Sequence, residues 1–159
     1  MRMAEITRAC RRITAVTLFL ILLAVIVPLR PALAHQLDSP DLGKTKSMAE
    51  MQHEIVMLLI KKKDFEKAAA EANKIFEMKW PGDQEPLLLK ELLYLSDQFL
   101  HEGRAPLGLQ LVEKSSRYFK STASQISVLK EKGYLYKAMG QDDKAIECFR
   151  QAQELENRK

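Results

Sequence analysis

The side chains that most often do chemistry are few in this 159-residue chain and stand apart from one another. Its histidines are His35, His53 and His101, and its cysteines are Cys10 and Cys148. The sequence has no G-x-S-x-G, no H-E-x-x-H, no C-x-x-C and no glycine-rich phosphate loop. Its carboxylates are scattered, without an isolated pair in apolar surroundings. We therefore predict that the protein is not an enzyme and binds no cofactor.

Two minor hypotheses remain for these side chains. His53 and His101 are far apart in sequence, so the simpler interpretation is that both are solvated helix residues; a metal ion held between them is the alternative, and we predict none. Cys148 is expected to be a small buried apolar group, with a disulfide-linked dimer as the alternative. Cys10 precedes the apolar run of the leader, so it cannot be a lipidated cysteine, which would follow that run.

Residues 1–34 predict a secretory signal peptide. Four arginines among the first 12 residues precede an apolar run over residues 13–29, and Ala32-Leu33-Ala34 matches a cleavage signal. We expect cleavage after Ala34 and export to the periplasm or another extracytoplasmic space. The alternative is an uncleaved membrane anchor, because a run of 17 residues is at the lower limit for crossing a bilayer.

The basic net charge belongs to the leader. Five of the 25 lysines and arginines and one of the 21 acidic residues lie in residues 1–34, which leaves 20 of each sign in the rest of the chain. A mature chain with zero net charge has no general attraction to phosphate or anionic lipid. We therefore expect no nucleic-acid partner, and a membrane contact only through an uncleaved leader.

Apolar residues at helical spacing predict an all-α domain of six helices over residues 47–159, after a flexible tether over residues 35–46. The first helix is expected to start at Ser47, where Ser47 and Glu50 would form a capping box, and to end at residues 61–63. Those lysines suit the carbonyl end of a helix, with an anion-binding patch as the alternative. The later helices are expected over residues 64–78, 86–102, 106–119, 124–139 and 142–155, with Asp64 and Asp142 as caps.

Small and bulky residues recur near the C-terminus at the spacing that lets two antiparallel helices pack: Gly133, Tyr136, Gly140, Ala145, Phe149, Ala152 and Leu155. This pattern resembles the tetratricopeptide repeat, a 34-residue helix-turn-helix unit. The resemblance implies an αα-hairpin superhelical array of three antiparallel pairs, with units at about 49–82, 89–122 and 126–159. It also implies repeat-packing roles, with the first unit atypical, for Ser96, Phe99, Gly108, Ser115, Gly133, Tyr136, Ala145, Phe149 and Ala152. A generic six-helix array is the alternative.

The resemblance further implies that a concave groove along the first helix of each unit binds a protein or peptide. Among the groove positions it assigns, the predicted partner-binding residues are Met57, Ile60, Lys61, Lys90, Leu93, Asp97, Leu100, His101, Lys130, Tyr134 and Lys137. The remaining positions hold Glu50, His53, Ser127 and Ala138. The alternative is that these are simply solvated helix faces, with Leu93 and Leu100 contributing to packing. Met57 stands where chaperone-tail binders carry asparagine, which argues against a carboxylate clamp.

We therefore expect an exported, non-catalytic adaptor or scaffold that binds another protein. A monomer is the simplest form, and an end-to-end dimer is the alternative. A rival hypothesis is a structural subunit of an envelope assembly, held in the inner membrane by an uncleaved N-terminal helix. A weaker rival is an accessory domain for an enzyme on a separate chain.

Overall fold

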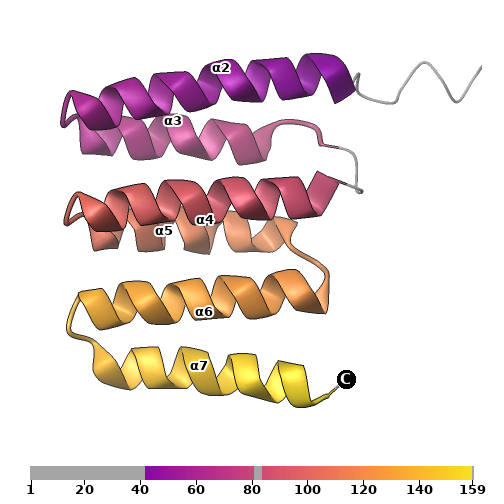
Figure 1. The fold of residues 1–159 in the computed structure, drawn as a ribbon, viewed down its shortest axis with the longest axis vertical. Coiled ribbons are helices and arrows are strands. Elements are labelled where there is room, and N and C mark those ends of the chain that lie inside the picture. The colour runs from indigo at the N-terminus through magenta and orange to yellow at the C-terminus, as the bar shows by residue number, and fades with distance from the viewer. Residues whose placement is uncertain (1–41, 81–83, 159) are drawn as a thin grey trace, which may run out of the picture. The chain divides into compact units, whose positions relative to one another are not determined.

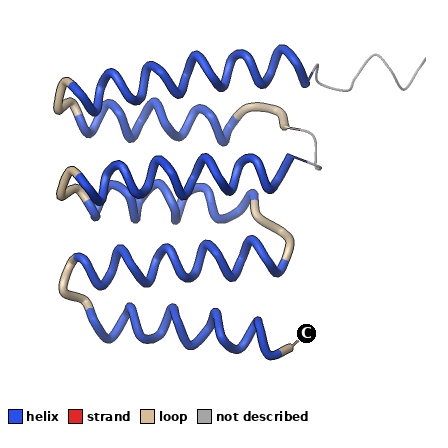
Figure 2. Tube along the Cα trace, in the orientation of Figure 1, coloured by secondary structure: helices blue, strands red, loops and turns tan. Residues whose placement is uncertain are grey.

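The computed structural model describes residues 42–80 and 84–158. These ranges contain six α-helices and no strand, which confirms the predicted all-α class (Figures 1 and 2). The helices are α2 (Leu42–Lys61), α3 (Phe65–Glu77), α4 (Glu85–His101), α5 (Ala105–Ser115), α6 (Thr122–Ala138) and α7 (Asp142–Asn157), with a 3-10 turn η2 (Ser116–Tyr118) after α5.

The predicted signal peptide lies outside the described residues, as does the predicted tether before residue 42. Within the described part of the chain, no helix is both long and apolar enough to cross a membrane.

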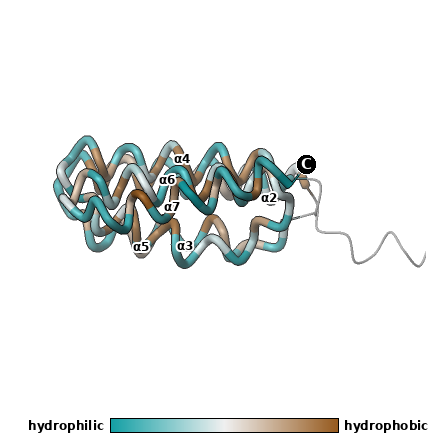
Figure 3. The backbone as a smooth tube through the Cα atoms, turned by 90° about the horizontal axis from the view of Figure 1, so that it is seen from below, coloured by the Kyte–Doolittle hydropathy of each residue, from teal (hydrophilic) through white to brown (hydrophobic). Residues whose placement is uncertain are grey.

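Consecutive helices form three antiparallel pairs, α2 with α3, α4 with α5, and α6 with α7 (Figure 1). Successive pairs are joined by packing of α3 against α5, of α5 against α6 and of α4 against α6. In the view from below, α3 and α5 lie on one side, and α4 and α6 lie on the other (Figure 3). This arrangement is the predicted array of helical hairpins.

The three hairpins turn in the same way. Lys63, Gly103 and Gly140 are each the fifteenth residue of their predicted unit, and each has a positive φ, of 62°, 69° and 71°. After each of these residues, a backbone N–H reaches back five residues to a carbonyl, as in Asp64 to Leu59 at 3.0 Å and Gln141 to Tyr136 at 2.9 Å. The same motif therefore closes every first helix, including that of the atypical first unit.

Small residues allow the helices of the last two units to pack closely. A Cβ atom at Gly133 would lie 2.6 Å from the Phe149 ring, so α6 and α7 meet at a point where only glycine fits. A Cβ atom at Gly108 would lie 3.2 Å from the carbonyl oxygen of Ser96. The other residues predicted to pack are buried (Phe99, Ser115, Ala145 and Ala152), except that Tyr136 and Phe149 are half-buried.

Several predicted helix ends are wrong. Helix α2 begins at Leu42, so residues 42–46 are helical rather than part of a tether, and Ser47 forms no capping box. The helix continues back through Lys44-Thr45-Lys46, which contain no glycine or proline, and includes Gly43 although glycine disfavours a helix. Gln141, not Asp142, is the N-cap of α7, and the Asp64 side chain makes no cap hydrogen bond.

Residues near the end of α5 also differ from the prediction. Phe119, expected in that helix, follows the 3-10 turn. It is nevertheless buried in the core.

Candidate partner-binding site

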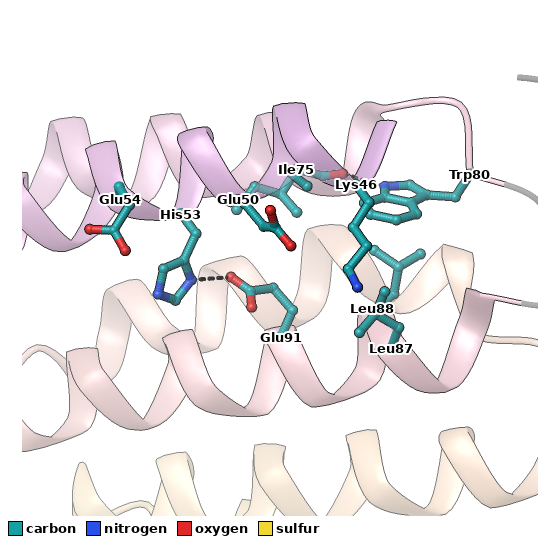
Figure 4. Close-up of a pocket in the computed structure, with 10 residues that line it drawn as sticks. Lys46, Glu50, His53, Glu54, Ile75, Trp80, Leu87, Leu88 and Glu91 are labelled. Carbon is teal, nitrogen blue, oxygen red and sulfur yellow. Dashed lines mark hydrogen bonds and ion pairs between the residues drawn. The ribbon is translucent and has the colours of Figure 1, made fainter. Parts of the chain in front are cut away.

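A pocket of about 290 Å³ lies between α2 and α4 (Figure 4). Its lining combines side chains from both helices with one residue of α3 and one from the segment that follows it: Lys46, Ala49, Glu50, His53, Glu54, Ile75, Trp80, Leu87, Leu88 and Glu91. The pocket thus joins the first helix pair to the second.

One part of the lining is apolar. Ala49, Ile75 and Leu88 are buried, whereas Leu87 is 40% exposed. The chain leaves α3 in an extended conformation at Met78, and Trp80 then returns to donate its indole N–H to the carbonyl oxygen of Ile75 at 2.7 Å. This hydrogen bond satisfies the only donor of the indole, so the ring contributes apolar and π surface to the pocket.

The other part of the lining is acidic. His53 Nδ1 on α2 lies 2.6 Å from Glu91 Oε1 on α4, which bridges the two helices (Figure 4). The His53 ring also lies 5.4 Å, centroid to centroid, from that of Tyr94. Glu50 and Glu54 are exposed and pair with no other residue in the described ranges. With three glutamates and Lys46, the lining has a formal charge of −2 when His53 is not counted.

The predicted groove residues have different environments. Lys61, Lys90, Asp97, His101, Tyr134 and Lys137 are exposed. His101 Nε2 lies 3.3 Å from Asp97 Oδ2, and the Tyr134 ring packs edge-on to Phe149. Lys130 is half-exposed, and its amine lies 2.7 Å from Glu156 on α7.

One predicted groove residue is wrong, and two others pack against the core. Ile60 is only 4% exposed and belongs to the core, because it lies on the same side of α2 as Val56 and faces the other helices. Met57 and Leu100 are partly buried against that core, and Leu93 is half-buried. Leu100 therefore contributes to packing, as the alternative interpretation expected.

Sequence reasoning missed most of this pocket. Of its ten lining residues, only Glu50 and His53 stand at positions that the family pattern assigns to the groove, and Trp80, Leu87 and Glu91 do not. The one available signal was compositional, since Trp80 is the only tryptophan in the chain. Their proximity depends on the spacing of α2, α3 and α4.

Two carboxylates between the second and third helix pairs have shifted pKa values. Burial raises the pKa of Glu131 on α6, and nearby Asp97 raises it further, while the hydrogen bond that Glu131 accepts from the Ser96 hydroxyl opposes both effects. Hydrogen bonds from Ser121 and Ser124, with a smaller contribution from the backbone N–H of Lys120, lower the pKa of Glu85 to about 2. Both carboxylates connect the second helix pair to the third.

Cys148 is buried, and burial raises the pKa of its thiol. Across residues 42–80 and 84–158, no three His, Cys, Asp or Glu side chains are grouped so that they could hold a metal ion.

Comparison with known proteins supports the repeat architecture. The family model described as tetratricopeptide repeat matches residues 129–159, which include most of α6 and all of α7. No curated protein matches the sequence.

Proposed function

We propose that the chain is a non-catalytic scaffold that binds a segment of another protein along α2, α4 and α6, and the support is the match of residues 129–159 to the tetratricopeptide-repeat model together with the array of helical hairpins. Arrays of this kind bind through extended surfaces that successive repeats build together. The observation that carries the proposal is the pocket between α2 and α4, where apolar and charged side chains meet in one concave site.

The exposed side chains around this pocket are suited to recognition. Tyr94, 44% exposed, lies beside His53 of the lining, and Tyr134, 54% exposed, is a predicted groove residue on α6. Exposed tyrosines supply large contact areas at a low cost in conformational entropy, and aromatic residues are enriched at interfaces. We propose that the bound segment contacts both tyrosines.

This proposal is tested by affinity capture from extracts of the source organism, with the full chain as bait. We expect Tyr94→Ala with Tyr134→Ala to reduce recovery of the specific partner about tenfold or more, as for the loss of interface anchors. The matched control is Leu58→Ala with Ile146→Ala, which removes two exposed apolar side chains outside the pocket and the predicted groove. Equal recovery by both variants and the unmodified chain would count against binding at this surface.

Export of the scaffold is part of the proposal, and its support is the leader sequence in residues 1–34. The intact mass and N-terminal sequence of the native protein test it. A chain that begins at His35 in the soluble exported fraction is the expected result. A chain that keeps residues 13–29 and sediments with the membrane would instead favour the anchored structural subunit.

A further inference from the structure

We propose that the pocket between α2 and α4 binds the side chain of a lysine or an arginine from the partner segment. The inference rests on the proposed function, since it names the class of residue that the scaffold recognises. It follows from the charge, the hydrogen-bonding groups and the apolar surface of the lining.

The charge of the lining favours a cation. Glu50, Glu54 and Glu91 contribute three carboxylates, and Lys46 contributes one ammonium group. Glu50 and Glu54 form no ion pair with another described residue, so both are available to an incoming group. An acidic side chain in this pocket would face like charges, which is unfavourable.

The hydrogen-bonding groups favour a donor. The Trp80 N–H is already donated to Ile75, and His53 Nδ1 faces Glu91. Lys46 is therefore the remaining cationic donor of the lining, whereas the carboxylates of Glu50 and Glu54 have only acceptor oxygens. Lysine and arginine carry donors alone, so their heads match this excess of acceptors.

The apolar part of the lining explains why a long side chain is needed. Leu87, Leu88 and Trp80 lie together on one side of the pocket, whereas the Glu50 carboxylate on α2 lies nearer its middle and the Glu91 carboxylate on α4 is directed at His53 (Figure 4). Lysine and arginine bury an aliphatic stem on apolar surface while the charged head reaches polar groups. A cation near an indole ring also gains cation–π attraction, which is strongest for tryptophan.

Lys46 acts as an internal competitor for this site. Its side chain extends from α2 toward Leu87 and Leu88, over the apolar part of the lining (Figure 4). An incoming cation must therefore approach the Lys46 ammonium or displace it. Removing the charge of Lys46 is expected to improve binding, an effect that misfolding cannot produce.

The test uses the full chain labelled with ¹⁵N, with the indole N–H signal of Trp80 as the reporter, because this is the only tryptophan. The probes are N-acetyl-arginine amide, N-acetyl-lysine amide and the neutral isostere N-acetyl-citrulline amide. We expect the two cationic probes to shift the Trp80 signal with saturation and the citrulline probe to leave it in place. An equal response to citrulline, or no response to either cation, would overturn the proposal.

Three variants locate the effect. Glu50→Gln with Glu54→Gln should weaken binding of the arginine probe roughly three- to tenfold, and Lys46→Gln should strengthen it roughly two- to fivefold, the range for partly exposed charges. The matched control, Glu147→Gln with Glu154→Gln, removes the same charge from the exposed face of α7 and should leave affinity unchanged. If both glutamine pairs weaken binding of the arginine probe equally, the effect comes from the net charge of the protein. That result would overturn the proposed site.

This test and the test of the scaffold can fail separately. If the tyrosine variant loses its partner but the arginine probe does not bind, the scaffold function is supported and the binding of a basic side chain in the pocket is rejected. If the probe binds in the pocket and partner capture does not depend on the tyrosines, binding of a basic side chain in the pocket is supported and partner binding along the proposed groove is rejected.

Discussion

Ser115 stands at a repeat-packing position where the last unit has Ala152, and its hydroxyl group lacks a hydrogen-bond partner in the described structure. The side chain is 1% exposed. We expect Ser115→Ala to raise the free energy of unfolding by about 1 kcal/mol, because an unpaired buried hydroxyl is removed and alanine favours the helix. Urea denaturation followed by circular dichroism measures the change.

The matched control is Ser96→Ala. Ser96 is also fully buried, but its hydroxyl donates to Glu131 on the neighbouring helix pair. The same substitution there should lower stability, since it leaves a half-buried carboxylate without this partner. Destabilisation by both substitutions would show that the Ser115 hydroxyl is paired in solution.

Of the three turns that end α2, α4 and α6, only the first has a residue with a side chain at the position of positive φ. Lys63 has a φ of 62°, whereas the other two turns have glycine there. An L-residue in this conformation carries a cost of roughly 1–2 kcal/mol that glycine avoids. We therefore expect Lys63→Gly to be more stable than Lys63→Ala by about 1 kcal/mol in thermal or urea unfolding.

The comparison of these two variants isolates the energetic cost of the backbone conformation at residue 63. Both lose the lysine contacts, which are an ion pair with Glu102 and an approach to the Phe65 ring. A more stable alanine variant would mean that the turn opens in solution to relieve the strain.

Glu85 connects the start of α4 to the start of α6. It accepts hydrogen bonds from the Ser121 hydroxyl at 2.7 Å and from the backbone N–H groups of Ser121 and Lys120 at 3.0 and 3.1 Å. These bonds favour the charged carboxylate and lower its pKa from 4.5 to about 2. Its contribution to stability is therefore present above pH 4.5 and is lost as the pH falls from 4.5 toward 2.

Glu85→Gln is expected to lower the melting temperature at pH 7, with a difference from the unmodified chain that shrinks on acidification through this range. Thermal unfolding at pH 7, 4 and 2.5 measures it. A difference that stays constant with pH would exclude the carboxylate charge as the cause. Glu66→Gln on the exposed face of α3 serves as the control for loss of one negative charge.

At the scale of the whole array, each helix pair is stabilised mainly by its neighbours, so loss of one connection should have a local effect. His53 bridges the first pair to the second through Glu91 and contacts Tyr94. We expect His53→Ala to speed amide hydrogen exchange in α2 and α3 several-fold while leaving α6 and α7 unchanged. Uniform acceleration in all six described helices would instead indicate that the array unfolds as a single unit.

The sequence predictions were accurate where the interacting residues are close in sequence and less accurate where they are distant. The pairing of α6 with α7 was predicted well because Gly133 and Phe149 are close in sequence and their contact depends on one short turn. The ends at Gly103 and Gly140 were predicted because only glycine adopts a positive φ readily. The start of α2 was wrong because Ser47 and Glu50 also fit inside a helix, so a capping motif does not by itself mark where the helix begins. Ile60 was misplaced because the face of α2 that is buried depends on its neighbours.

The sequence by itself determined the helical class, the hairpin pairs and the small residues at their contacts, because helix periodicity and close packing act between residues near one another in the chain. Only the tertiary structure decided where the pocket lies. Its lining comes from α2, from Ile75 and Trp80 at the end of the first pair, and from α4. The distances among these segments depend on how the first pair is set against the second, and that packing involves many weak contacts between residues distant in sequence.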